Sequence, residues 1–94
     1  MDKQKFTSVF DAICDTRTEA ANMRLRADLM MNINKIIQEN RWTQQQAAQY
    51  CGITQPRIND LVRGKIDKFS LDALVNINAE LGQSVSLQFS AVLA

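Results

Sequence analysis

The 94-residue sequence predicts a mainly α-helical domain of five helices, followed by one β-strand. Apolar residues recur at helical spacing through most of the chain, and glycines stand at the expected helix ends. After residue 83 the pattern changes to strict alternation of polar and apolar residues, as in a half-buried strand. The expected helices are 6–13, 16–40, 43–51, 54–64 and 70–81, and the expected strand is 84–89.

Composition indicates one soluble domain. Apolar residues make up 46% of the chain and charged residues 22%, and no apolar run approaches the roughly 18 residues that span a bilayer. The first residues are a poor signal peptide, because Asp11 and Asp15 break the short apolar segment. We therefore expect a cytoplasmic protein without a membrane partner.

The net charge of +1 says little about partners, but its distribution says more. Residues 1–40 carry six basic and six acidic groups, whereas residues 41–69 carry five basic and two acidic groups. A local basic excess of this kind is typical of a surface that meets nucleic acid. It coincides with the two short helices predicted there.

The residue types argue against an enzyme or a metal site. The chain has no histidine, no nucleophile motif and no glycine-rich phosphate loop, so we expect no catalytic residues, no cofactor and no metal. Its two cysteines are far apart in sequence. Cys51 lies on the apolar side of its helix and is interpreted as a small buried hydrophobic residue, while Cys14 is expected to be a reduced thiol.

The first 19 residues are expected to form an amphipathic arm. Phe6, Val9, Phe10 and Ile13 are spaced by three and four residues, and residues 15–18 are expected to interrupt this helix. Thr16 and Glu19 have the spacing of a capping box, which predicts the start of a second, long helix. Its apolar stripe consists of Leu25, Leu29, Ile33, Ile36 and Ile37.

Residues 43–64 carry the pattern of a helix-turn-helix within a domain expected at 20–82. Thr43 and Gln46 have capping-box spacing, and Gly52 fits a turn with positive φ. Thr54 can cap the second helix, with Pro56 in its first turn, and Gly64 stands where that helix should stop.

The spacing of small and apolar residues strengthens this interpretation. Ala48 is small where the second helix would cross the first. The wedge between the helices would be filled by Ala47, Cys51, Ile53, Ile58 and Leu61. An ordinary helical hairpin is the alternative, but it does not require all of these residues together.

The start of the second helix carries candidate readers of DNA bases. Gln and Asn side chains can pair with adenine, Arg can pair with guanine, and an apolar surface can touch a thymine methyl group. The candidates are Gln55, Pro56, Arg57, Asn59 and Asp60. Asp60 either accepts a hydrogen bond from cytosine or orients Arg57 or Arg63, and the sequence does not decide between these roles.

A second set of residues is predicted to contact the phosphate backbone. Helix N-termini and cations bind phosphates and set affinity more than sequence choice. This set is Gln44, Thr54, Arg63, Lys65 and Lys68. A solvated helix end with ordinary surface cations is the alternative interpretation.

The last segment, 83–94, is expected to be a dimerisation strand and tail. Val85, Leu87 and Phe89 would share one face of the strand. A strand needs a partner, and no second strand is evident, so we expect pairing with the same strand of a second copy across a two-fold axis. A disordered or loosely docked tail is the alternative.

The motif resembles the phage-repressor and Cro-like family of DNA-binding domains, also called the xenobiotic-response-element family. The resemblance rests on Thr-Gln-Gln-Gln-Ala-Ala at 43–48, Gly-Ile-Thr-Gln at 52–55 and Leu-Val-Arg-Gly-Lys at 61–65. More narrowly, the chain looks like the HigA-type antitoxins through Phe-Asp-Ala at 10–12, Arg-Ala-Asp-Leu at 26–29, Gly-Lys-Ile-Asp-Lys-Phe-Ser-Leu at 64–71 and Leu-Gly at 81–82.

The resemblance implies a lambda-repressor-like fold and a homodimer that binds double-stranded operator DNA and represses its own operon. It also implies a partner toxin, commonly a ribonuclease, that the protein neutralises. Two alternatives stay open: a stand-alone phage-type repressor, and a protein-interaction module without specific DNA binding.

Overall fold

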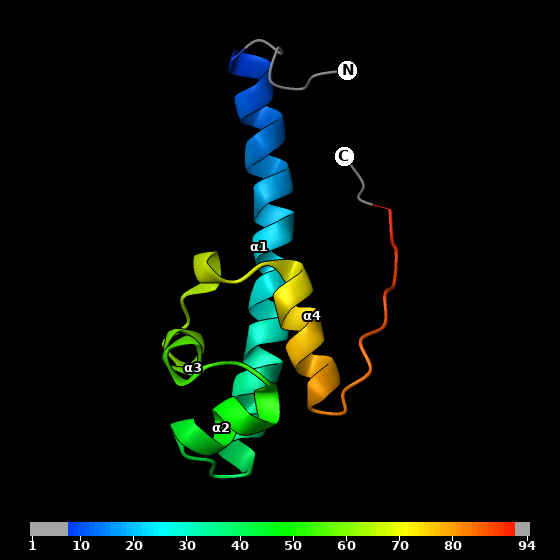
Figure 1. Cartoon of the computed structure of the whole chain (residues 1–94). Helices are drawn as coiled ribbons and strands as arrows, with labels where there is room; N and C mark the ends of the chain where they lie inside the picture. Colours follow the sequence, from blue (N-terminus) through cyan, green and yellow to red (C-terminus); the bar gives the residue numbers. More distant parts are fainter. Residues whose placement is uncertain (1–7, 92–94) are drawn as a thin grey trace.

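The computed structural model describes residues 8–91, and the side chains from residue 16 onward. This part of the chain contains four α-helices and one 3-10 turn (Figure 1): α1 (Ser8–Glu39), α2 (Gln44–Cys51), α3 (Gln55–Val62), η2 (Ile66–Lys68) and α4 (Leu71–Glu80). The C-terminal half of α1 packs beside α4, and α2 and α3 lie at the same end of α1. No helix among these residues is long and apolar enough to cross a membrane.

The predicted break between two N-terminal helices is wrong, because α1 runs without interruption from Ser8 to Glu39. Residues 15–18 contain no Gly or Pro, and Asp and Thr lower helix propensity by less than about 1 kcal/mol each. Continuing the helix keeps the backbone hydrogen bonds that a break would lose. The side chains of Phe6, Val9, Phe10, Ile13 and Cys14 lie outside the described part of the chain, so their predicted roles stay predictions.

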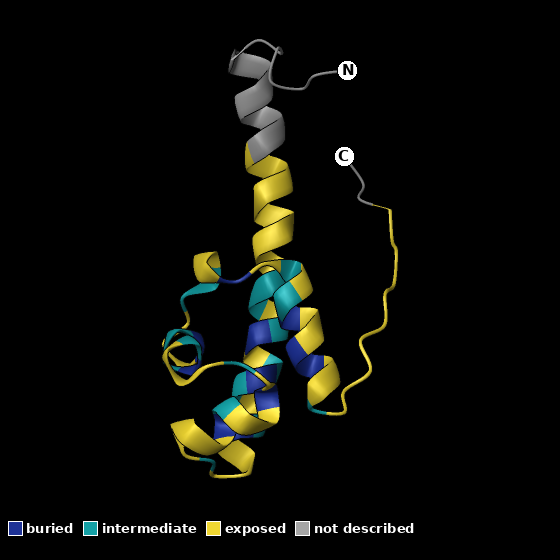
Figure 2. Cartoon of the chain, viewed as in Figure 1, coloured by how far each residue is buried: buried dark blue, intermediate teal, exposed yellow. Residues whose placement is uncertain are grey.

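The two halves of α1 have different surroundings. Met30, Ile33 and Ile37 in its C-terminal half are buried in the core, whereas every described side chain from 16 to 25 is exposed (Figure 2). The helix is therefore a core element at one end and a projecting arm at the other. The remaining buried apolar residues are Ala47, Cys51, Ile58, Leu61, Phe69, Leu74 and Ile77.

The predicted caps of the three shorter helices are confirmed. The Thr43 hydroxyl accepts from the Gln46 N–H at 3.1 Å, and the Gln46 side chain accepts from the Thr43 N–H at 2.9 Å. Thr54 and Ser70 cap α3 and α4 in the same way, through the N–H groups of Arg57 and Ala73. These hydrogen bonds satisfy N–H groups that the first turn of a helix cannot pair internally.

The predicted C-terminal β-strand is wrong. Residues 83–91 follow an extended path away from α4 and form no strand (Figure 1). Leu87 and Phe89 are 74% and 88% exposed, and Val85 is exposed too. Alternation decides which side chains would share a face, but it supplies no backbone hydrogen-bond partner. No other part of the described chain provides an adjacent strand, so the segment stays without β structure.

Candidate nucleic-acid interface

The position of α3 is fixed by its inner face. Ile58 and Leu61 are fully buried against the core, with Ala48 of α2 partly buried beside them. Asn34 of α1 donates a hydrogen bond to the Leu61 carbonyl oxygen at 3.1 Å, which anchors the C-terminal end of α3 to the long helix. The inner face of α3 is therefore committed to packing, and its other side is left to face outward.

The turn before α3 has the geometry that the sequence predicts. Gly52 has φ +73° and ends α2, and its N–H donates to the Ala48 carbonyl oxygen. A left-handed residue at this point reverses the chain within two residues, so that Thr54 can begin α3. Gln55 and Pro56 follow in the first turn of α3, and both are exposed. This end of the helix is open to a partner.

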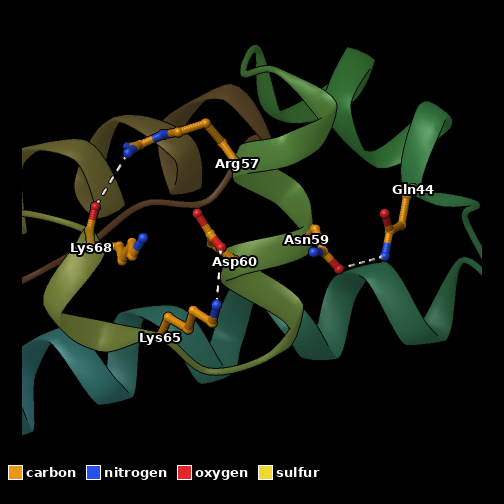
Figure 3. Close-up of polar contacts among 6 residues, drawn as sticks. All are labelled: Gln44, Arg57, Asn59, Asp60, Lys65 and Lys68. Atoms are coloured by element: carbon orange, nitrogen blue, oxygen red, sulfur yellow. Dashed lines mark hydrogen bonds and ion pairs between the residues drawn. The ribbon is translucent and has the colours of Figure 1, made fainter.

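The other predicted base readers already have partners within the protein (Figure 3). The Gln44 side-chain amide donates to the Asn59 Oδ1 atom at 3.4 Å, which links the start of α2 to the middle of α3. Asp60 forms an ion pair with Lys65 at 3.6 Å. This ion pair joins Asp60 to Lys65, and not to Arg57 or Arg63, the two residues named as its alternatives from the sequence.

Arg57 turns toward the loop that follows α3. Its Nη1 atom donates to the Lys68 carbonyl oxygen at 3.2 Å (Figure 3), and its guanidinium carbon lies 4.4 Å from the centre of the Phe69 ring. A cation on an aromatic ring in this range contributes about 0.5 to 2 kcal/mol. The side chain predicted to pair with guanine is thus held by the 65–69 loop.

The cations predicted to meet phosphates lie close together in the chain. Arg63 is the C-cap of α3, and Lys65 and Lys68 follow within five residues. Arg63 and Lys68 are exposed. Lys65 is partly exposed and forms the ion pair with Asp60. The described chain therefore carries three accessible or partly accessible cations directly after its outward-facing helix.

A family model described as a helix-turn-helix domain matches residues 12–90, which is more than four fifths of the chain. The chain belongs to this helix-turn-helix family. A search of curated proteins gives no match. Membership agrees with the resemblance to Cro-like phage repressors and indicates a DNA-binding regulator, a class that is typically not enzymatic.

Sequence reasoning gave no structural role to two residues that shape this helix-turn-helix domain, although both stand in the motifs quoted at 26–29 and 64–71. Phe69 is 2% exposed and carries the Arg57 guanidinium, and Arg26 of α1 donates to the carbonyl oxygens of Ile66 and Phe69, each at 3.3 Å. Their spacing gave no signal because the contacts join residues 12 to 43 positions apart. An isolated Phe in a predicted loop, preceded by a basic residue, was the available hint.

Cys51 fulfils its predicted structural role in the helix-turn-helix core. Its side chain is buried, and this burial raises the pKa of the thiol from 9.0 to about 11. The low polarity around the sulfur disfavours the charged thiolate, which is the reactive form. Trp42 also packs on the core, and its ring is stacked on that of Tyr50 with 4.3 Å between the ring centroids.

Proposed function

We propose that the protein is a sequence-specific transcriptional repressor that inserts α3 into the major groove of operator DNA. The observation that carries this proposal is the exposed first turn of α3 on a helix whose opposite face is fully buried. A helix whose apolar face is buried in the core and whose exposed face is polar can contact base edges without a rearrangement of the fold. Membership in the helix-turn-helix family supports the same direction.

The proposed contacts divide into two groups. Gln55 and Asn59 read base edges, and Pro56 touches a thymine methyl group. Asp60, on the same helix, accepts a hydrogen bond from a cytosine amino group. Phosphates are held from both sides of α3 by Gln44, Thr54, Arg63, Lys65 and Lys68. Gln44 has a double role, because its amide both approaches the backbone and steadies Asn59.

We further propose that the repressor acts as a homodimer. One recognition helix buries a small surface, whereas two helices about 34 Å apart can enter successive major grooves. Side chains of Val85, Leu87 and Phe89 are proposed to contact the second copy, since large apolar side chains left this exposed favour association. This contact needs no β-pairing.

The finer biological role we propose is that of a HigA-type antitoxin, which represses its own operon and neutralises a ribonuclease toxin. The support is the set of motifs in residues 10–12, 26–29, 64–71 and 81–82. A stand-alone repressor is the competing role. The reading frame beside this gene distinguishes them, because a small basic toxin-like product is expected only for the antitoxin.

The experiment for the proposed function is a binding titration on DNA from upstream of the protein's own gene. Affinity should fall steeply with salt, with about 0.9 added to the log–log slope for each phosphate contact. The Lys65→Ala variant should weaken binding to all DNA sequences about equally. If no promoter fragment is bound even at low salt, the proposed function is wrong, and a protein-interaction module becomes the better description.

A further inference from the structure

The loop at residues 65–69 is held by two arginines from two different helices. Arg57 reaches it from α3 through the Lys68 carbonyl oxygen and the Phe69 ring. Arg26 reaches it from α1 through the carbonyl oxygens of Ile66 and Phe69. Three of the five peptide carbonyls in this short loop therefore accept from a guanidinium.

The start of the loop is fixed by other contacts, because the N–H groups of Lys65 and Ile66 donate to the carbonyl oxygens of Asp60 and Gly64, and the Ile66 side chain packs on the core. The loop's single 3-10 turn is closed by bonds from the Lys68 N–H to the Lys65 carbonyl and from the Phe69 N–H to the Ile66 carbonyl. The turn has no side-chain cap and no buried residue, and Phe69, which follows it, is the only buried residue of the 65–69 loop. The backbone bonds of Lys68 and Phe69 stay within the loop, so this end of the loop is tied to other elements by the two arginines and the buried Phe69 ring.

We propose that Arg57 is a positioning residue, which holds the 65–69 loop so that Lys68 meets a DNA phosphate, rather than a reader of bases. The inference rests on the proposed DNA-binding function. An arginine reads guanine with the two N–H groups of its fork, and here one of its terminal nitrogens is already bonded to the loop. Base reading would therefore compete with the Lys68 carbonyl oxygen and the Phe69 ring for the same guanidinium.

The contact with Arg57 also fixes the point from which the Lys68 side chain extends. The group that Arg57 holds is the peptide of Lys68 itself, so the cation's side chain starts from the fixed peptide. Lys68 is exposed, and it can extend toward a phosphate while its backbone stays in place (Figure 3). Arg63 lies outside this contact, at the C-cap of α3. Arg57 should therefore affect Lys68 strongly and Arg63 weakly.

A double-mutant cycle in DNA affinity tests the proposal. Arg57→Ala and Lys68→Ala are measured singly and together on promoter DNA, and the matched cycle pairs Arg57→Ala with Arg63→Ala. The Lys68 cycle should deviate from additivity by at least about 3-fold, because Lys68 loses its position when Arg57 is removed. The Arg63 cycle should be additive within about 2-fold. A general loss of stability would affect both cycles alike.

Two further measurements separate the possible outcomes. Base preference of the Arg57→Ala variant should match that of the wild type, whereas loss of a guanine reader would relax one base pair by roughly 5- to 150-fold. Hydrogen exchange in the free protein should be at least about 5-fold faster at the Lys68 and Phe69 amides in this variant. Wild-type binding with a relaxed base pair, additive cycles and unchanged exchange would overturn the positioning role alone. Absence of wild-type binding would overturn the proposed function instead.

Discussion

The helix-turn-helix core and the two extensions of the chain are built from similar residues but differ in what surrounds them. Leu61 in α3 is fully buried, whereas Leu25 on the projecting half of α1 is 49% exposed, and Phe89 in the tail is 88% exposed. Apolar residues at regular spacing predict a buried face only where a second element is available to cover it. The core is therefore stabilised by contacts within the chain, whereas the extensions carry apolar surface that the described part of the chain does not cover.

The largest expected effect comes from one substitution made in both regions. Leu61→Ala should lower the free energy of unfolding by about 2 to 5 kcal/mol, because it removes buried methyl groups and leaves a cavity. Leu25→Ala should change it by no more than about 0.5 kcal/mol. Urea denaturation measures both. Equal losses would show that the projecting half of α1 is packed as tightly as the core, and would contradict the difference described above.

The Cys51 thiol offers a second test of the core. Its folded-state pKa of about 11 lies above the unfolded value of 9.0, so the folded state binds more protons between these values. Its contribution to stability is complete below pH 9 and is lost as the pH rises toward 11, by up to about 2 to 3 kcal/mol. Denaturation of wild type and Cys51→Ala at pH 8 and pH 10.5 isolates this effect. The same pH dependence in both proteins would contradict it.

The turn between α2 and α3 should show a smaller effect. Gly52→Ala places a Cβ atom 3.7 Å from the Glu80 side chain, which is ordinary contact, so the cost comes from the φ of +73°. We expect a loss of about 1 to 2 kcal/mol in unfolding free energy. Gly52→Asn should cost less, since Asn tolerates this backbone region better. If Asn costs as much as Ala, the side-chain environment controls the turn instead of its backbone.

The smallest effect on folding is expected in the tail. Replacing Leu87 and Phe89 together by Ser should change unfolding free energy by no more than about 0.5 kcal/mol per residue, because both side chains are exposed. Self-association should nevertheless weaken in sedimentation experiments if these side chains meet a second copy. An unchanged association constant would remove them from the dimer contact and leave other exposed surfaces as the interface.

Most features that depend on residues close together in the sequence were predicted correctly, and most features that depend on distant partners were not. The caps at Thr43, Thr54 and Ser70 and the turn at Gly52 were predicted because each depends on residues a few positions apart. The continuous α1 was missed because polar residues were taken as a break, although nothing there prevents a helix. The strand was wrongly predicted because its pattern concerns side chains, while a strand requires a paired backbone.

In the candidate site too, contacts between residues distant in sequence could not be predicted. Its exposed positions, Gln55 and Pro56, follow from their place before the buried Ile58, and so were predictable. The partners of Arg57, Asn59 and Asp60 were not, because a list of polar residues on one helix face does not say which of them bind one another. Only the packing of α1, α2 and the 65–69 loop around α3 decides this.

A base-preference profile on promoter DNA tests whether the exposed start of α3 reads DNA. Gln55→Ala is compared with Gln49→Ala, the same change at an exposed position of α2. We predict that Gln55→Ala loses about 1 to 3 kcal/mol at the cognate site and relaxes the preference at one base pair, while Gln49→Ala keeps the wild-type profile. An unchanged profile for Gln55→Ala, with wild-type affinity, would contradict the claim.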